Sequence, residues 1–218
     1  MTIAKEISDI QKELPPTVKL VAVSKFKPNE AILEAYSTGL RDFAESRPQE
    51  LKQKIFELPK DINWHFIGHL QSNKIRMIID DVALIHSVDS LRLAREIDKE
   101  ASVRTLIKNC LLQIHIASED TKQGFTEKEI FESISEIKCL RNIRICGLMG
   151  MASFVEDQQR IANEFSYLKG VFMKLKERYY KDCDHFKEIS MGMSSDYKLA
   201  IEEGSTMVRI GSKIFGER

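Results

Sequence analysis

Lys25 is the first side chain in this sequence whose type and position could support covalent chemistry. It ends the β-branched run VKLVAVSK at residues 18–25, which has the pattern of a buried β-strand. Desolvation at a strand end lowers the pKa of a lysine, and the neutral amine is a nucleophile that can form a Schiff base with an aldehyde. Lys27 follows two residues later, so this run alone favours an ordinary loop lysine that reaches solvent.

Arg209 is the second such side chain, and it stands between Val208 and Ile210 in the apolar run MVRI. A buried guanidinium needs a partner, because removing its charge from water is costly. Two kinds of partner remain open at this point. One is a carboxylate of the protein, such as Glu45 or Asp42, and the other is a bound ligand.

Two glycine- and serine-containing turns follow expected strands near the C-terminus. They are SMGMSS at residues 190–195 and RIGSKIFG at residues 209–216. Backbone amides at a helix N-terminus can bind phosphate, and barrels of eight βα units often hold a phosphate between the loops after strands seven and eight. Helix capping is the better explanation of each turn taken alone. For the two turns together, a phosphate site and helix capping are equally good explanations. With the two basic residues, the turns predict a small phosphorylated ligand, and a phosphorylated aldehyde would fit.

The elements that position these residues follow from alternating apolar runs and amphipathic stretches. Strands are expected at residues 18–25, 41–47, 63–69, 84–88, 110–116, 143–149, 186–191 and 207–210. Helices are expected at 3–14, 28–38, 48–56, 72–79, 90–103, 126–137, 156–179 and 196–202, with Thr126 and Glu129 spaced as a capping box. Eight strand–helix units predict an α/β fold, a closed (β/α)8 (TIM) barrel with an extra N-terminal helix. An open doubly wound sheet is the alternative, but no G-x-G-x-x-G follows an expected strand.

Composition narrows the function classes. The 218 residues include 33 Lys and Arg and 33 Asp and Glu, and this zero balance argues against a protein that coats nucleic acid or an anionic membrane. Four cysteines without a C-x-x-C pair predict reduced thiols in a cytoplasmic protein. No linker divides the chain, so we expect one domain over residues 1–218, with residues 1–16 forming a helix packed on the barrel.

The histidines offer little support for a metal site. His65 and His69 are four residues apart, which on a strand separates them by about 13 Å, too far for one ion. His86 and His115 fall on expected strands, and we interpret both as structural residues. The sequence therefore predicts no metal centre.

Five segments together identify a family. They are AVSKFKP at 22–28, WHFIGHLQSNK at 64–74, GLMGMA at 147–152, SMGMSSD at 190–196 and AIEEGSTMVRIGSKIFGER at 200–218. With them the chain resembles, from about residue 18 to its end, the pyridoxal phosphate homeostasis protein family, whose barrel is of the alanine racemase N-terminal type. The resemblance implies that pyridoxal 5′-phosphate (PLP) is held as a Schiff base on Lys25.

The same resemblance implies roles for further residues. It places Ser194 and the turn at Gly211 and Ser212 against the phosphate, and Arg209 against the pyridine nitrogen. The family motif F-G-E-N, whose asparagine lies near the cofactor, is here Phe-Ala-Glu-Ser at residues 43–46. Ala44 therefore replaces the glycine, and Ser46 offers one hydroxyl where the family has an amide.

The resemblance favours one of three functions. A guanidinium that donates to the pyridine nitrogen disfavours its protonation, which weakens PLP as an electron sink. The chain also ends soon after the eighth strand, so we expect no second domain of the kind that racemases of this type use. Both points favour a PLP carrier that maintains the cofactor supply for PLP-dependent apo-enzymes, rather than an enzyme. The zero net charge is compatible with a monomer. A PLP-dependent amino-acid racemase is the alternative, and a phosphosugar-binding barrel without a Schiff base is a third interpretation.

Overall fold

Eight parallel strands close into a barrel in chain order, from β1 beside β2 round to β8 beside β1. The computed structural model describes residues 2–117 and 123–217. The strands are β1 Lys19–Val23, β2 Asp42–Glu45, β3 Asn63–Phe66, β4 Val82–Val88, β5 Lys108–Gln113, β6 Ile143–Met149, β7 Glu188–Ser190 and β8 Met207–Ile210. The predicted (β/α)8 barrel is thus confirmed, and the open sheet is excluded.

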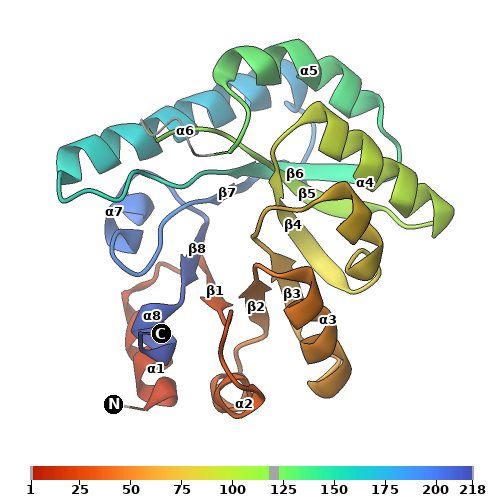
Figure 1. Cartoon of the computed structure of the whole chain (residues 1–218). Coiled ribbons are helices and arrows are strands. Elements are labelled where there is room, and N and C mark those ends of the chain that lie inside the picture. Colours follow the sequence, from red (N-terminus) through yellow and green to blue (C-terminus); the bar gives the residue numbers. More distant parts are fainter. Residues whose placement is uncertain (1, 118–122, 218) are drawn as a thin grey trace.

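Helices surround the strands as an outer ring (Figure 1). They are α1 Ile3–Glu13, α2 Asn29–Ser37, α3 Pro48–Glu57, α4 Leu91–Val103, α5 Glu127–Cys139, α6 Gln158–Tyr179, α7 Tyr197–Glu202 and α8 Ser212–Phe215. One apolar layer fills the space between this ring and the strands. A smaller cluster lies inside the barrel and consists of Val21, Val23, Ala44, Leu84, Leu111, Met149 and Met207. Successive strand residues alternate between the two layers, as a twofold side-chain period requires.

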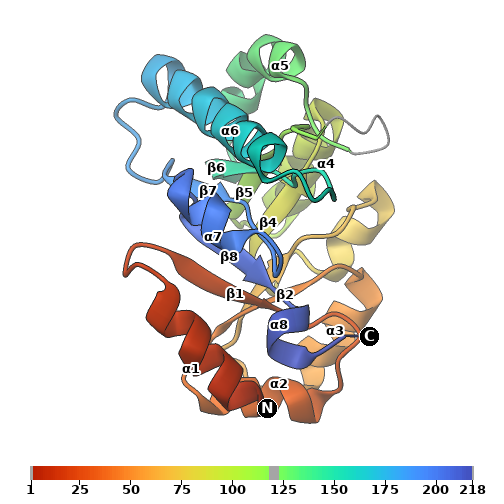
Figure 2. The same cartoon turned by 90° about the vertical axis from the view of Figure 1, so that its left-hand side faces the viewer.

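The N-terminal helix packs against the C-terminal end of the chain. Thr2 caps α1 by accepting a hydrogen bond from the amide of Lys5 at 3.3 Å, and Ile7 and Ile10 form its buried face. Figures 1 and 2 show α1 beside α8, and Lys213 of α8 lies 3.9 Å from the carboxylate of Glu13. This packing ties the segment after β8 to the outside of the barrel.

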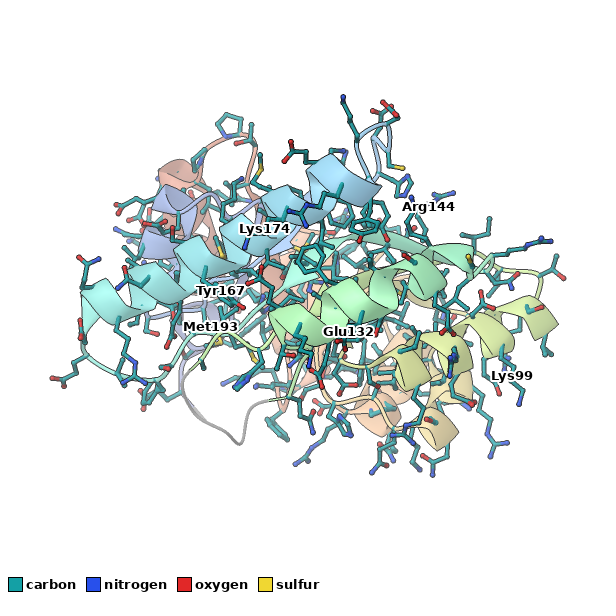
Figure 3. The ribbon with its side chains drawn as sticks, turned by 90° about the horizontal axis from the view of Figure 1, so that it is seen from above. Lys99, Glu132, Arg144, Tyr167, Lys174 and Met193 are labelled. Carbon is teal, nitrogen blue, oxygen red and sulfur yellow. The ribbon has the colours of Figure 1, made fainter. Side chains whose placement is uncertain are left out.

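Helices α5 and α6 lie side by side over one flank of the barrel, as Figure 3 shows with Glu132 on α5 and Lys174 on α6. The ammonium of Lys174 is 2.5 Å from the carboxylate of Glu127, which joins the two helices. The capping box predicted for α5 is present, with Thr126 and Glu129 each accepting from the backbone of the other. None of the helices among the described residues combines the length and apolarity needed to cross a bilayer.

One expected α-helix differs in type. Residues 72–79 form instead a 3-10 helix, η1, over Ser72–Met77. The amide of Lys74 donates to Gln71 and that of Ile78 to Ile75, so the hydrogen bonds span three residues rather than four. The segment is short, and the tighter winding turns Ile75 and Ile78 into the core, where both are fully buried.

Candidate functional site

The predicted site residues come from neighbouring strands at one end of the barrel. In the register of the sheet, Val21 of β1 pairs with Arg209 of β8, and Val23 pairs with Ala44 of β2. Lys25 follows β1 by two residues, and the corresponding segments after β2, β7 and β8 carry the predicted serines and glycine. Because all eight strands are parallel, these segments share the C-terminal mouth of the barrel, where barrels of this type place their sites.

The residues on both sides of Lys25 are anchored. The hydroxyl of Ser24 donates to Glu45 at 2.6 Å, and the amide of Phe26 donates to Glu50 at 2.6 Å. Phe26 has a φ of +63°, a backbone conformation that costs a non-glycine residue about 1–3 kcal/mol. Its ring lies 4.4 Å from the guanidinium of Arg47. These contacts fix the backbone conformation on both sides of Lys25, which is itself half-buried.

Lys54 of α3 joins these anchors beneath the loop. Its ammonium donates to the carbonyl of Ser24 at 2.9 Å, to Glu45 at 2.8 Å and to Glu50 at 2.7 Å. Burial raises the pKa of Glu45, although the charge of Lys54 opposes the shift. Sequence reasoning missed Lys54 and Glu50. Their sequence signal is a basic and an acidic residue four apart on a helix, which is common on solvated helix faces.

The two predicted turns meet at one hydroxyl. The oxygen of Ser194 accepts hydrogen bonds from the amides of Gly211 at 3.3 Å and Lys213 at 3.4 Å. Two backbone amides therefore converge on a single oxygen atom beside Ser212, the first residue of α8. The loop after β7 turns at Gly192, whose φ is +92° and where an added Cβ would lie 2.6 Å from that of Ala200. A phosphate oxygen that replaced the Ser194 oxygen as acceptor would be bound by the two amides, and the Ser194 hydroxyl could then donate to the same group.

Arg209 is 3% exposed and its guanidinium bonds to neutral oxygens. One terminal nitrogen donates to the carbonyl and the hydroxyl of Ser190, both at 2.7 Å, and the other donates to the carbonyl of Gly150 at 3.0 Å. Burial lowers the pKa of Arg209 to about 10, so the side chain keeps its charge at neutral pH. The carboxylate partners considered from the sequence are therefore wrong, because Glu45 bonds to Lys54 and Asp42 to His65.

Two histidines lie inside the barrel behind Arg209. His86 is fully buried and its Nδ1 lies 3.0 Å from the Ser190 hydroxyl. Its Nε2 lies 2.9 Å from Nδ1 of His65, whose own Nε2 lies 2.9 Å from Asp42. The described residues contain no group of three metal-binding side chains, and His69 contacts Asp89 instead, at 3.3 Å.

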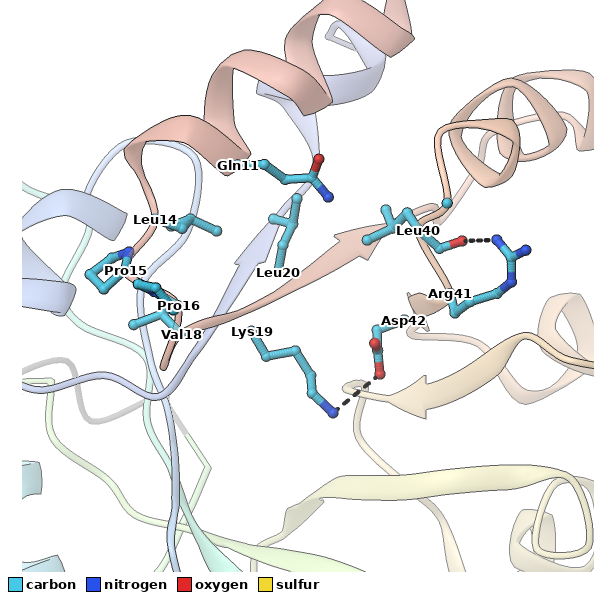
Figure 4. Close-up of a pocket in the computed structure, with 11 residues that line it drawn as sticks. Gln11, Leu14, Pro15, Pro16, Val18, Lys19, Leu20, Leu40, Arg41 and Asp42 are labelled. Carbon is cyan, nitrogen blue, oxygen red and sulfur yellow. Dashed lines mark hydrogen bonds and ion pairs between the residues drawn. The ribbon is translucent and has the colours of Figure 1, made fainter.

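Two cavities of about 400 Å³ lie at the opposite end of the barrel. One is lined by Lys19, Asp42 and His65 among others, at the N-terminal ends of the strands. The other lies between α1, the start of β1 and the turn before β2, and Figure 4 shows Lys19 and Asp42 paired at its edge. Neither cavity is lined by Lys25 or Arg209. The candidate site is therefore identified by the side chains and backbone amides that meet at the mouth of the barrel, and not by either of these cavities.

Comparison with known proteins identifies the family of this chain. Residues 2–218 match the family described as alanine racemase, N-terminal domain. The chain is 41% identical over 213 residues to a pyridoxal phosphate homeostasis protein of Synechocystis, which covers 97% of this chain and 96% of that protein. It superposes on PipY of Synechococcus elongatus without PLP with a TM-score of 0.94 at 35% identity, covering 99% and 100% of the two chains. PipY with PLP bound has a TM-score of 0.89 at 34% identity, with the same coverage.

Proposed function

Because this chain belongs to the pyridoxal phosphate homeostasis protein family, we propose that it binds PLP at the mouth of the barrel and maintains the cellular supply of this cofactor. The observation that carries the proposal is the convergence of Lys25, Arg209 and the amides of Gly211 and Lys213 on neighbouring strand ends. PLP supplies an aldehyde, an aromatic ring nitrogen and a phosphate. The residues present offer an amine, a guanidinium and a cradle of donors for these three groups.

Lys25 holds the cofactor as a Schiff base in this proposal. Its neighbours Ser24 and Phe26 are held by hydrogen bonds to Glu45 and Glu50, which fix the backbone from which the Lys25 side chain extends and would present its amine to the aldehyde of PLP. Ser194, Gly211 and Ser212 bind the phosphate through a hydroxyl and backbone amides. Ser46 follows Ala44, an interior residue of β2, by two positions, and its hydroxyl replaces the asparagine amide of the family motif.

Arg209 donates to the ring nitrogen and holds the ring in place. Its guanidinium keeps its charge, so it favours an unprotonated ring nitrogen, and such a ring withdraws electrons weakly. An unprotonated ring nitrogen supports a carrier rather than an enzyme, and it disfavours an amino-acid racemase. Sustained racemisation of L-alanine by the PLP-loaded protein, lost in Lys25→Ala, would overturn the carrier function.

The setting of the protein follows from its thiols and charge. All four cysteines are free, which supports a reducing compartment such as the cytoplasm. The balance of 33 basic and 33 acidic residues gives no preference for nucleic acid or a membrane surface. We propose that residues 1–218 act as one PLP-binding domain, as a monomer, and pass the cofactor to PLP-dependent apo-enzymes.

Trapping of the cofactor tests the Lys25 assignment. The purified protein is incubated with PLP, treated with borohydride and digested, and the modified peptide is mapped by mass spectrometry. We expect the adduct on Lys25, together with a visible absorption band that Lys25→Ala lacks. Lys27→Ala is the matched control, because Lys27 donates instead to backbone carbonyls near the C-terminus, including that of Phe215 at 3.0 Å, and should leave both signals unchanged. An adduct elsewhere, or none, refutes the assignment.

A further inference from the structure

A row of buried polar side chains crosses the barrel interior behind Arg209. It runs from Asp42 through His65, His86 and Ser190 to the guanidinium, with distances of 2.9, 2.9, 3.0 and 2.7 Å. Both histidines and Ser190 are at most 2% exposed. Buried polar groups in such a row are costly unless each donor meets an acceptor, so the direction of every hydrogen bond matters.

The two ends of the row determine that direction. An ionised carboxylate only accepts hydrogen bonds and a guanidinium only donates them. The hydrogen bond with His65 and the nearby ammonium of Lys19 hold the pKa of Asp42 below its ordinary value, although burial opposes them. Nε2 of His65 therefore donates to Asp42. At the other end, the hydroxyl oxygen of Ser190 accepts from Arg209.

The middle of the row then has one consistent arrangement with neutral rings. A neutral imidazole has one donor and one acceptor nitrogen, so Nδ1 of His65 accepts from Nε2 of His86. Nδ1 of His86 in turn accepts from the hydroxyl of Ser190. If His65 were an imidazolium, both rings would donate towards Ser190, and its oxygen would accept from His86 and Arg209 at once. Its own hydrogen would then need another acceptor.

We propose that Asp42, His65, His86 and Ser190 form a one-way hydrogen-bond relay that orients the guanidinium of Arg209 towards the cofactor. The inference deepens the proposed function and rests on it, since Arg209 is there the residue that contacts the ring nitrogen. His86 and His65 are positioning residues, because they act through Ser190 and do not themselves touch the cofactor. With its hydrogen directed to His86, the Ser190 hydroxyl has its lone pairs available to accept from Arg209.

The relay also connects the two ends of the barrel. Asp42 and His65 line the cavity of about 400 Å³ at the N-terminal ends of the strands, and Lys19 lies 3.4 Å from Asp42 there. Arg209 lies near the mouth, at the other end. Four hydrogen bonds therefore join the carboxylate at the cavity to the guanidinium that we place against the cofactor.

Nitrogen NMR of the wild-type protein tests the direction of the relay without any substitution. In protein labelled with ¹⁵N-histidine, we expect His65 and His86 at pH 7.5 to be neutral and to carry their hydrogen on Nε2. Assignment uses His65→Asn and His86→Asn, each of which removes one set of signals. A ring protonated on Nδ1, or an imidazolium at either position, overturns the relay.

PLP affinity of three substitutions at one position tests the positioning role. His86→Asn places a carbonyl oxygen near the former Nδ1 and keeps the acceptor for Ser190. His86→Gln is equally polar, but its longer side chain carries the acceptor past that position, and His86→Leu has none. We expect His86→Asn to bind PLP within about twofold of wild type. The other two should bind about tenfold more weakly, as expected for a buried hydroxyl that has lost its acceptor.

The outcomes separate this inference from the proposed function. If wild type binds PLP on Lys25 but all three variants bind equally well, the relay is wrong and the carrier function stands. If wild type fails to bind PLP, the carrier function fails, while the NMR measurement still decides the relay. Circular dichroism and urea unfolding of each variant identify any that do not fold, and the wild-type NMR result holds regardless of them.

Discussion

The buried imidazole of His86 makes the stability of this protein depend on pH in a way that one substitution should remove. Burial, with the nearby positive charges of Arg209 and Lys19, holds the pKa of His86 well below its ordinary value of 6.5. The unfolded chain exposes this ring and titrates it normally. As the pH falls below about 6.5, the unfolded state therefore binds a proton that the folded state excludes, and the protein loses stability.

The size of this loss follows from the linkage between protons and folding. One proton contributes about 1.36 kcal/mol per pH unit once the unfolded ring is fully charged. Integrated from pH 7 to pH 5, with the folded ring neutral throughout, the contribution of His86 is about 1.9 kcal/mol. The free energy of unfolding of His86→Asn should therefore fall by about 1.9 kcal/mol less than that of wild type over this range.

Urea unfolding at pH 7, 6 and 5 measures this difference. Titratable groups remote from His86 contribute equally in both proteins and cancel in the comparison. His69→Asn is the control, because the side chain of His69 is half exposed and its substitution should leave most of the pH dependence in place. Equal losses of stability in wild type and His86→Asn would refute the view that the folded protein keeps this ring neutral.

Three further substitutions test other parts of the site. In urea unfolding, Gly192→Ala should destabilise the protein by about 1–3 kcal/mol more than Gly39→Ala, since both residues have φ near +92° but only the new Cβ at position 192 would meet Ala200. Equal losses of unfolding free energy in the two variants would contradict this packing. Lys54→Met should lower the free energy of unfolding by about 3–5 kcal/mol, because it leaves Glu45 buried without its cation, and adding Glu45→Gln should recover part of this loss. If the double variant recovers nothing, the loss does not come from this ion pair. In fluorescence titration, Ser194→Ala should weaken the binding of PLP about fivefold and leave the binding of pyridoxal, which lacks the phosphate, unchanged. An equal loss of affinity for both ligands would place Ser194 away from the phosphate.

Local patterns predicted most of the fold. The bounds of β6 and β8 agree with the predicted strands at 143–149 and 207–210, and the capping box of α5 is present as expected. Strand alternation and helix capping depend on residues within four positions of one another, so the sequence alone expresses them. The 3-10 helix η1 is the exception, because its winding places Ile75 and Ile78 against the core, and the local pattern does not express this tertiary contact.

The candidate site divides in the same way. Lys25, Arg209 and the two turns could be selected from the sequence, since each stands at the end of an apolar run. Their contacts could not be predicted. Ser190 lies 104 residues from His86 and 19 from Arg209, and its bonds to both depend on the closure of the barrel.

The amino-acid sequence therefore specifies the order of eight strand–helix units and the chemical types that stand at their ends. Tertiary structure alone decides which of these residues bond to each other. It pairs Ser194 with the amides of Gly211 and Lys213 and places Lys54 beneath the Lys25 loop. It also joins His86, interpreted from the sequence as structural, to His65, considered there only as a metal ligand, in a row behind Arg209. The physical reason is that buried polar groups must find partners wherever the packed barrel brings them, at separations that no local pattern encodes.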